Sequence, residues 1–211
     1  MSNPMQDNLT SLEIDALTEI FNIGIGRAAN SLNQMVSQTV DLTIPEIEIL
    51  PNKVAKQKLD FDSGVDISAV TQRFSGDFQG QALLMFTKEN GLQLVSLLLG
   101  NKIPIEDLSE LEQDSLVEIG NVILNACFGT VINFLQSSIS IEMPEFIQGN
   151  IDKIFTYSSD NDWSLYIKVK FSLPSKHIAG HISFIMDITS LEVFQESVRK
   201  FVFGITSKVG S

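Results

Sequence analysis

The chain has 211 residues, 44% of them hydrophobic, and a formal net charge of −12 at pH 7. This length and composition are sufficient for a sizeable buried core. The excess of acidic residues argues against a nucleic-acid partner, which needs clustered Lys and Arg. No apolar run reaches the roughly 18 residues that span a bilayer, so we expect a cytoplasmic protein without membrane insertion.

The first predicted helix lies in a segment that occurs twice. Shifting the sequence by 99 residues aligns LTSLEIDALTEIFNI with LSELEQDSLVEIGNV. Apolar residues at helical spacing in both copies predict two amphipathic helices. Each copy also opens with a capping-box pattern, which satisfies the free N–H groups at a helix start. The residues concerned are Thr10 with Glu13, and Ser109 with Glu112.

Strand-like segments follow each helix. The segments 40–50 and 139–147 alternate between polar and apolar residues, and their prolines, Pro45 and Pro144, require an edge, a bulge or a bend. After a polar loop, each copy continues with two strands and a closing helix, predicted at 65–75, 79–87 and 88–100, then at 163–173, 178–186 and 190–204. Gly100 and Gly204 are suited to the ends of these closing helices.

The predicted fold is therefore α+β. It is a tandem duplication of a unit made of a helix, three strands and a helix, in which helices pack on an antiparallel sheet with pseudo-two-fold symmetry. We expect a single domain over residues 1–211, with a first half at 8–100, a second half at 107–204 and a linker near 101–107. Two half-units of this size can share one core.

Asp15, Glu19 and Asn22 form a polar row on the first helix, within a sector about 60° wide. A single row of this kind is ordinarily a solvated helix face. Contact with solvent does not require both copies to keep the same three residue types at identical spacing. The better explanation is that this helix face has the same role in both copies. The second row consists of Asp114, Glu118 and Asn121.

The residue types in the two rows restrict the chemistry. No His or Lys adjoins them to activate a nucleophile, and a Glu with an Asn is not the carboxylate pair of a glycosidase. His177 and His181 have no Cys or acidic residue at ligand spacing, so we expect no metal or cofactor in this chain, and Cys127 fits a small buried hydrophobe. An Asn amide can donate to and accept from one water, while a Glu can pair with a cation on a partner.

Both copies also share one longer spacing: Asp, three residues, Glu, two residues, Asn, then 22 residues and Pro. This pattern resembles the signature of the CheC, CheX and FliY family of bacterial chemotaxis phosphatases, and two copies in about 200 residues look most like a CheC-type member. The resemblance implies that the protein removes the phosphoryl group from the phospho-aspartate of a CheY-type receiver domain.

The resemblance also implies a role for each residue of the signature. Asn22 and Asn121 would orient the attacking water, and Glu19 and Glu118 would pair with the receiver's Lys. The Mg²⁺ needed for the reaction would belong to the receiver. Supporting roles fall to the remaining positions, Asp15, Asp114, Pro45 and Pro144.

The first copy differs from the family pattern at Phe21, where the second copy has Gly120. The helical angle directs Phe21 away from Glu19 and Asn22, so we expect both rows to act. Two other interpretations stay open. The chain could be a non-catalytic module of the chemotaxis or flagellar switch apparatus, for example a CheD-binding protein, or the rows could form a homodimer contact.

Overall fold

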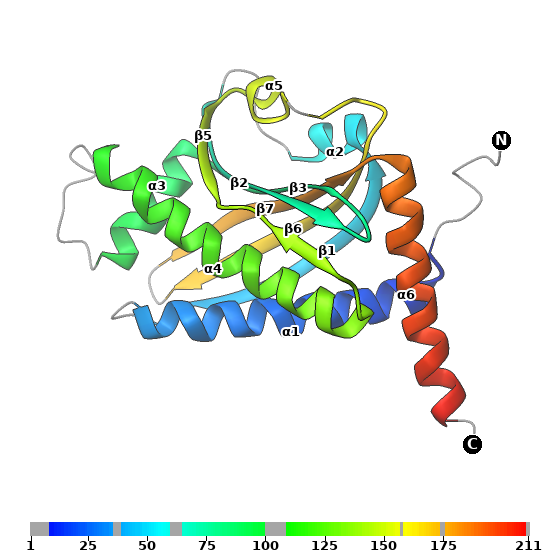
Figure 1. Ribbon diagram of the computed structural model, residues 1–211. Coiled ribbons are helices and arrows are strands. Elements are labelled where there is room, and N and C mark those ends of the chain that lie inside the picture. The colour runs from blue at the N-terminus through cyan, green and yellow to red at the C-terminus, as the bar shows by residue number, and fades with distance from the viewer. Residues whose placement is uncertain are drawn as a thin grey trace.

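The computed structural model describes residues 9–35, 39–59, 65–99, 109–156, 158–173 and 176–209. Figure 1 shows a curved sheet with two long helices, α1 (Ser11–Met35) and α4 (Ser109–Leu135), along one of its faces. All strand pairs in this seven-stranded sheet are antiparallel. The predicted combination of helices with an antiparallel sheet is confirmed.

The elements of the two copies follow the same order, except that two short strands in the second copy take the place of one strand in the first. The first copy continues after α1 with β1 (Asp41–Pro51), α2 (Asn52–Lys58), β2 (Ile67–Gly76), β3 (Gly80–Thr87) and α3 (Lys88–Leu98). The second continues after α4 with β4 (Ile139–Ile141), β5 (Glu145–Gly149), α5 (Ile151–Ile154), β6 (Trp163–Leu173), β7 (Lys176–Met186) and α6 (Ile188–Val209).

Three details differ from the sequence prediction. Short helices, α2 and α5, occupy the place of the predicted polar loop, because apolar side chains there, such as Ala55 and Ile154, are buried. The first strand of the second copy is split into β4 and β5. Helix α6 continues past Gly204 to Val209. Gly100 and the predicted linker at 101–107 lie outside the described residues.

The strand order shows how the two copies fit together. The order is β1-β6-β7-β3-β2-β4, and β5 also pairs with β2. The first strand of each copy therefore pairs with the second strand of the other copy. At the centre, β3 pairs with β7 so that Leu83 faces Ser183, its equivalent at the offset of 100 residues. This pairing is consistent with a tandem duplication about a pseudo-two-fold axis.

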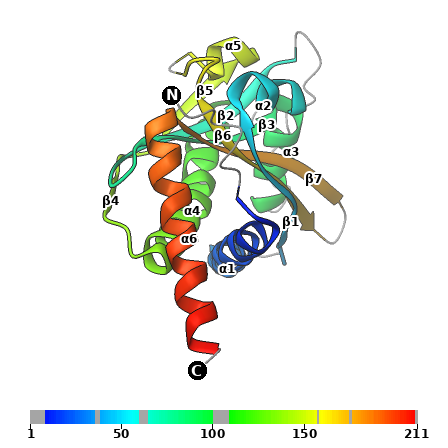
Figure 2. The ribbon, with the colours of Figure 1, turned by 90° about the vertical axis from the view of Figure 1, so that its right-hand side faces the viewer.

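The sheet buries apolar side chains on both faces, since successive residues of a strand point to opposite sides. On β2, Val70 and Phe74 belong to the large core beneath α1 and α4, whereas Ile67 and Ala69 belong to a smaller core under α2 and α5. Figure 2 shows these two helix pairs on opposite sides of the sheet.

The start of α1 is capped as the sequence predicts. The backbone N–H of Thr10 donates to Oε2 of Glu13 at 2.7 Å, and the N–H of Glu13 donates to Oγ1 of Thr10 at 3.4 Å. Both orphan donors are thus satisfied by the reciprocal pair. The side chains of Ser109 and Glu112, the corresponding pair of α4, lie outside the described side chains.

Helix α4 is the most apolar long helix of the described chain. Its stretch Gln113–Leu135 is long and apolar enough to cross a membrane by length and composition alone, but 50% of its 18-residue window is buried inside the fold. It packs against α1, where a Cβ added at Gly24 would lie 3.2 Å from the Cα of Cys127. The apolar side of α4 is thus occupied by the protein's own core.

Candidate functional site

The first polar row lies on the exposed side of α1. Asp15, Glu19 and Asn22 are all exposed, and within the described residues none of the three side chains has a hydrogen bond or ion pair. Phe21 is 1% exposed and its ring lies 5.5 Å from that of Phe184 in the core. Phe21 therefore fills space between α1 and the sheet and leaves the row accessible.

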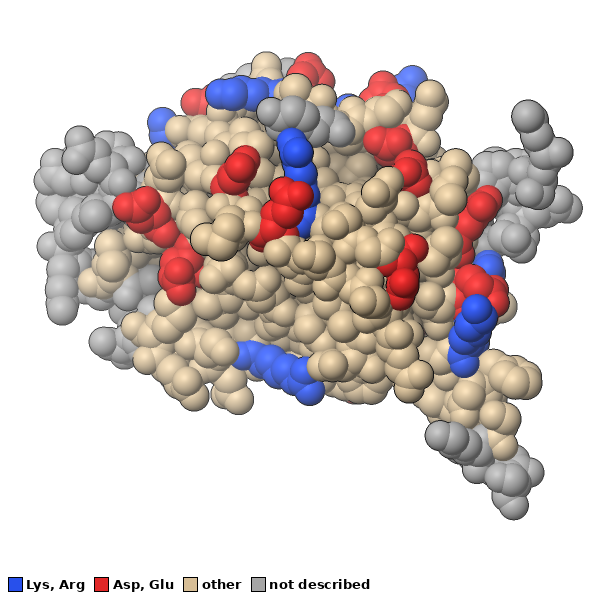
Figure 3. Space-filling model, viewed as in Figure 1, with Lys and Arg blue, Asp and Glu red and all other residues tan. Residues whose placement is uncertain are grey.

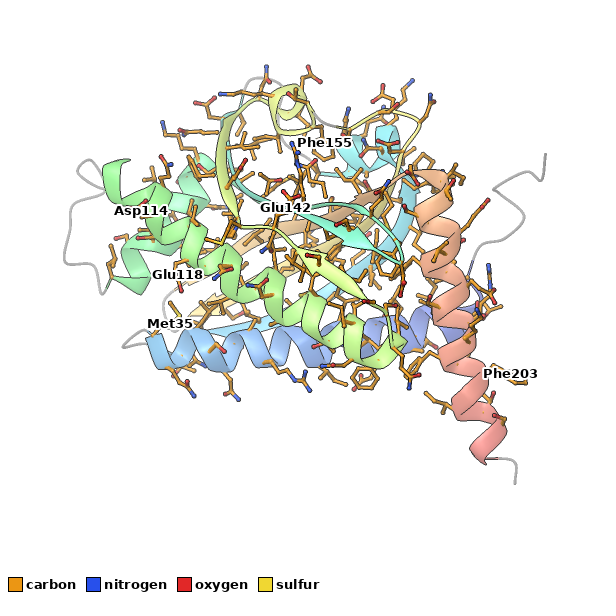
Figure 4. All side chains as sticks on the ribbon, in the orientation of Figure 1. Met35, Asp114, Glu118, Glu142, Phe155 and Phe203 are labelled. Carbon is orange, nitrogen blue, oxygen red and sulfur yellow. The ribbon has the colours of Figure 1, made fainter. Side chains whose placement is uncertain are left out.

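The second row lies on the N-terminal half of α4. Figure 4 shows Asp114 and Glu118 projecting from the helix, and both are exposed. Asn121 is half-buried, one turn further along. At Gly120 the helix lies directly on the sheet, because an added Cβ would meet Cγ1 of Val70 at 2.5 Å. The glycine thus lets α4 lie close against β2.

A chain of side-chain amides holds Asn121 in place. Nδ2 of Asn125 donates to Oδ1 of Asn121 at 2.6 Å, and Nε2 of Gln72 donates to Oδ1 of Asn125 at 3.3 Å. The same Gln72 nitrogen donates to the backbone carbonyl of Glu142 at 2.9 Å. Gln72 comes from β2 and is 2% exposed, so the chain of amides begins in the core and ends at the surface.

The two signature prolines occupy irregular strand positions, as the sequence predicts. Pro45 lies within the edge strand β1, where the pairing register with β6 shifts between Thr43 and Glu46. Pro144 lies in the break between β4 and β5, two residues after Glu142. The structure therefore brings the Pro144 segment to Asn121 through Gln72 and Asn125. The described contacts give no corresponding connection between Pro45 and Asn22.

A groove adjoins the second row. It has a volume of about 320 Å³ and is lined by Leu32, Met35, Val95, Leu99, Asp114, Ser115, Glu118 and Ile119. Met35, at the end of α1, is 50% exposed. Figure 3 shows separate acidic side chains on a largely uncharged surface in this view. A free carboxylate beside apolar surface suits a partner that presents a cation next to an apolar side chain.

Neither a reactive cysteine nor a cluster of metal ligands lies at the rows in the part of the chain that the structure describes. The thiol of Cys127 is buried, and this burial raises its pKa to about 12, so it is not a nucleophile at neutral pH. No three His, Cys, Asp or Glu side chains gather as metal ligands in the part of the chain that the structure describes. What the second row offers is an oriented amide one helical turn from a free carboxylate.

Sequence reasoning missed Asn125 and Gln72. The comparison of the two copies selected residues that recur, whereas Asn125 corresponds to Gly26. The available signal was the spacing of four residues between Asn121 and Asn125, which places them on the same helix face. Gln72 gave no such signal, since only the packing of β2 under α4 brings it to the site.

The chain is similar to proteins of chemotaxis and of the flagellar motor switch. The CheC-like family model matches residues 12–49, which include the first row. The CheY-P phosphatase CheC of Bacillus subtilis strain 168 is 25% identical over 138 residues, or 63% of this chain and 65% of that relative. The flagellar motor switch phosphatase FliY of the same organism is 23% identical over 172 residues, 81% of this chain and 44% of the relative.

Solved structures share the fold. The crystal structure of Thermotoga maritima FliY matches 92% of this chain and all of its own with a TM-score of 0.73 at 20% identity. The FliM middle domain of H. pylori matches 90% of this chain with a TM-score of 0.66 at 12% identity. The family model and the curated relatives show that the chain is similar to CheC and FliY proteins, and the T. maritima structure shows that the fold is shared. The matches span less than two thirds of the length of both curated relatives.

Proposed function

We propose that this chain is a phosphatase that removes the phosphoryl group from the phospho-aspartate of a CheY-type receiver domain. The observation that carries the proposal is the fixed amide of Asn121, one turn from the free carboxylate of Glu118. Two relatives are named as phosphatases, one of them as a CheY-P phosphatase. We place the protein in the cytoplasm, where such receivers act.

In this proposal a water molecule attacks the phosphorus atom and the bond between phosphorus and the aspartate oxygen breaks. The products are a free carboxylate and inorganic phosphate, and the water proton leaves with the phosphate or to solvent. Asn121 and Asn22 hold the water in line through the donor and acceptor of one amide. Positioning is the dominant task, because phosphoryl transfer needs little covalent chemistry from the protein.

In the same proposal, the acidic residues of the two rows help the receiver domain to dock. Glu118 and Glu19 pair with the receiver's Lys, and Asp114 and Asp15 support the row one turn earlier. The receiver holds the Mg²⁺, which neutralises charge on the phosphoryl oxygens. Pro144 and Pro45 shape the strands beside the helices, through the strand break and the register shift described above.

The test is the decay of a phosphorylated receiver after its phosphodonor is removed. The wild-type chain should accelerate release of phosphate, and Asn121→Ala should lower the turnover while the chain stays folded. No acceleration by the wild-type chain contradicts the proposal. A non-catalytic module of the chemotaxis or flagellar switch apparatus, for example one that binds CheD, remains the alternative. The FliM middle domain shares the fold, and fold alone does not separate catalysis from binding.

A further inference from the structure

We propose that Asn125 and Gln72 are positioning residues, which fix the direction in which Asn121 presents its amide. This inference rests on the proposed phosphatase function and assigns a further task within its second site. The hydrogen-bonded chain runs from the Glu142 carbonyl through Gln72 and Asn125 to Asn121.

The backbone carbonyl of Glu142 sets the direction of the whole chain. A carbonyl oxygen only accepts, so Gln72 must turn its Nε2 toward it, and this nitrogen also donates to Oδ1 of Asn125. Asn125 is left with its Nδ2 facing Asn121, whose Oδ1 accepts. The free Nδ2 of Asn121 then points away from Asn125. This nitrogen and the second lone pair of Oδ1 provide the donor and the acceptor that one water needs.

The strand break at Pro144 makes that carbonyl available. The N–H of Glu142 still donates to the carbonyl of Arg73 at 2.9 Å, as in a continuing ladder. β4 ends at Ile141 and pairing with β2 resumes only at Glu145, so the Glu142 carbonyl accepts from the Gln72 side chain. Pro144 itself has no N–H to donate to the ladder. Pro144 therefore influences the orientation of the Asn121 amide through the hydrogen bonds of Glu142, Gln72 and Asn125.

Gln72 is an unusual residue for its position. It lies between Val70 and Phe74 on the face of β2 that contributes to the large core. It is 2% exposed, and its Oε1 has no hydrogen-bond partner among the described residues. A buried polar atom without a partner is destabilising, so core packing alone would favour an apolar side chain here. The hydrogen bond by which Gln72 orients Asn125 explains why a glutamine occupies this buried position.

At the first site, neither Asn125 nor Gln72 has a polar equivalent. Gly26 stands where Asn125 stands in the second copy, four residues after Asn22. The ladder equivalent of Gln72 is Ile167, because Gln72 pairs with Ala82 and Ile167 pairs with Ile182, 100 residues later. The amide of Asn22 is therefore free to rotate, whereas that of Asn121 is held. An ordinary surface pair on α4 would not need the buried Gln72 beneath it.

The test uses a chain that carries Asn22→Ala, so that only the second row acts on the phosphorylated receiver. In this background Asn125→Ala should lower kcat about ten-fold with an unchanged KM, since a misplaced group slows the reaction without weakening docking. Asn125→Asp keeps the size and still accepts from Gln72, but it cannot donate to Asn121, and kcat should fall equally. The matched control is Asn133→Asp, which adds the same charge at another exposed position of α4.

A second measurement does not depend on activity. The side-chain amide of Asn121 should be ordered by ¹⁵N relaxation in the wild-type chain and mobile in the Asn125→Ala variant, while that of Asn22 is mobile in both. An unchanged kcat in Asn125→Ala and Asn125→Asp, or an equally mobile Asn121 amide with and without Asn125, overturns the inference. A wild-type chain with no phosphatase activity overturns the proposed function itself, and the role of Asn125 with it.

Discussion

Gly120 of α4 lies directly against Val70 of β2, so that a Cβ added to the glycine would sit 2.5 Å from Cγ1 of the valine. This contact brings the helix down onto the sheet one residue before Asn121. In the first copy Phe21 takes the equivalent position and packs against Phe184. Helix α4 thus approaches the sheet closely at a glycine, whereas α1 packs on the sheet through a buried phenylalanine.

The Gly120 contact predicts a loss of stability in Gly120→Ala. The added methyl group meets a branched side chain on a strand, and overpacking of this kind costs about 1–3 kcal/mol. The free energy of unfolding in urea measures the effect. Gly129→Ala is the matched control in the same helix, because nothing lies within 4 Å of a Cβ there, and it should stabilise by up to about 1 kcal/mol. Equal effects at both glycines would contradict the role given to Val70.

The sequence predicts the elements better than their connections. Periodicity and the capping box identify α1 and its start at Thr10, and the repeat identifies the polar rows on α1 and α4. The exchange of first strands between the copies has no local signal, since it depends on contacts far apart in the chain. For the same reason the amide chain could not be predicted: Gln72 and Asn125 are 53 residues apart and meet only after folding.

Docking through Glu118 predicts a specific kinetic effect of charge reversal. Glu118→Lys replaces the expected attraction to the receiver's Lys by repulsion, so KM should rise and its dependence on salt should change sign or vanish. Glu192→Lys, an exposed position on α6, provides the matched change in net charge. Saturation curves of phosphate release measure both. If the two variants shift KM equally, the effect is one of net charge and the pairing role is wrong.

The ion pairs of Lys58 with Glu46 and Glu48 predict a pH-dependent contribution to the free energy of unfolding, close to the register shift in β1. Lys58 of α2 pairs with Glu46 and, at 2.5 Å, with Glu48, and the bond from Lys58 holds the pKa of Glu46 below its usual range. A depressed carboxyl pKa contributes stability above the ordinary value of about 4.3, and this contribution is lost as the pH falls through the lowered pKa.

The variant Lys58→Met tests this contribution. About a third of the Lys58 side chain is exposed, at 35%, so solvent screening keeps the expected loss at pH 7 to about 1 kcal/mol or less. The difference from wild type should shrink as the pH falls through the lowered pKa of Glu46, and it should also shrink at high salt. Urea unfolding at pH 7 and pH 3 measures it. A loss that persists unchanged at pH 3 would show that packing of the lysine stem, not its charge, is responsible.

The most direct test of the proposed phosphatase is the decay of a phosphorylated CheY-type receiver with the double variant Asn22→Ala/Asn121→Ala. Loss of water positioning at both rows should lower kcat by at least about 10²-fold, or roughly 2.7 kcal/mol, to near the spontaneous rate. The control is Asn30→Ala/Asn133→Ala, two exposed asparagines of α1 and α4 outside the rows, which should retain the wild-type rate. A folded double variant that dephosphorylates the receiver as fast as wild type would contradict the account.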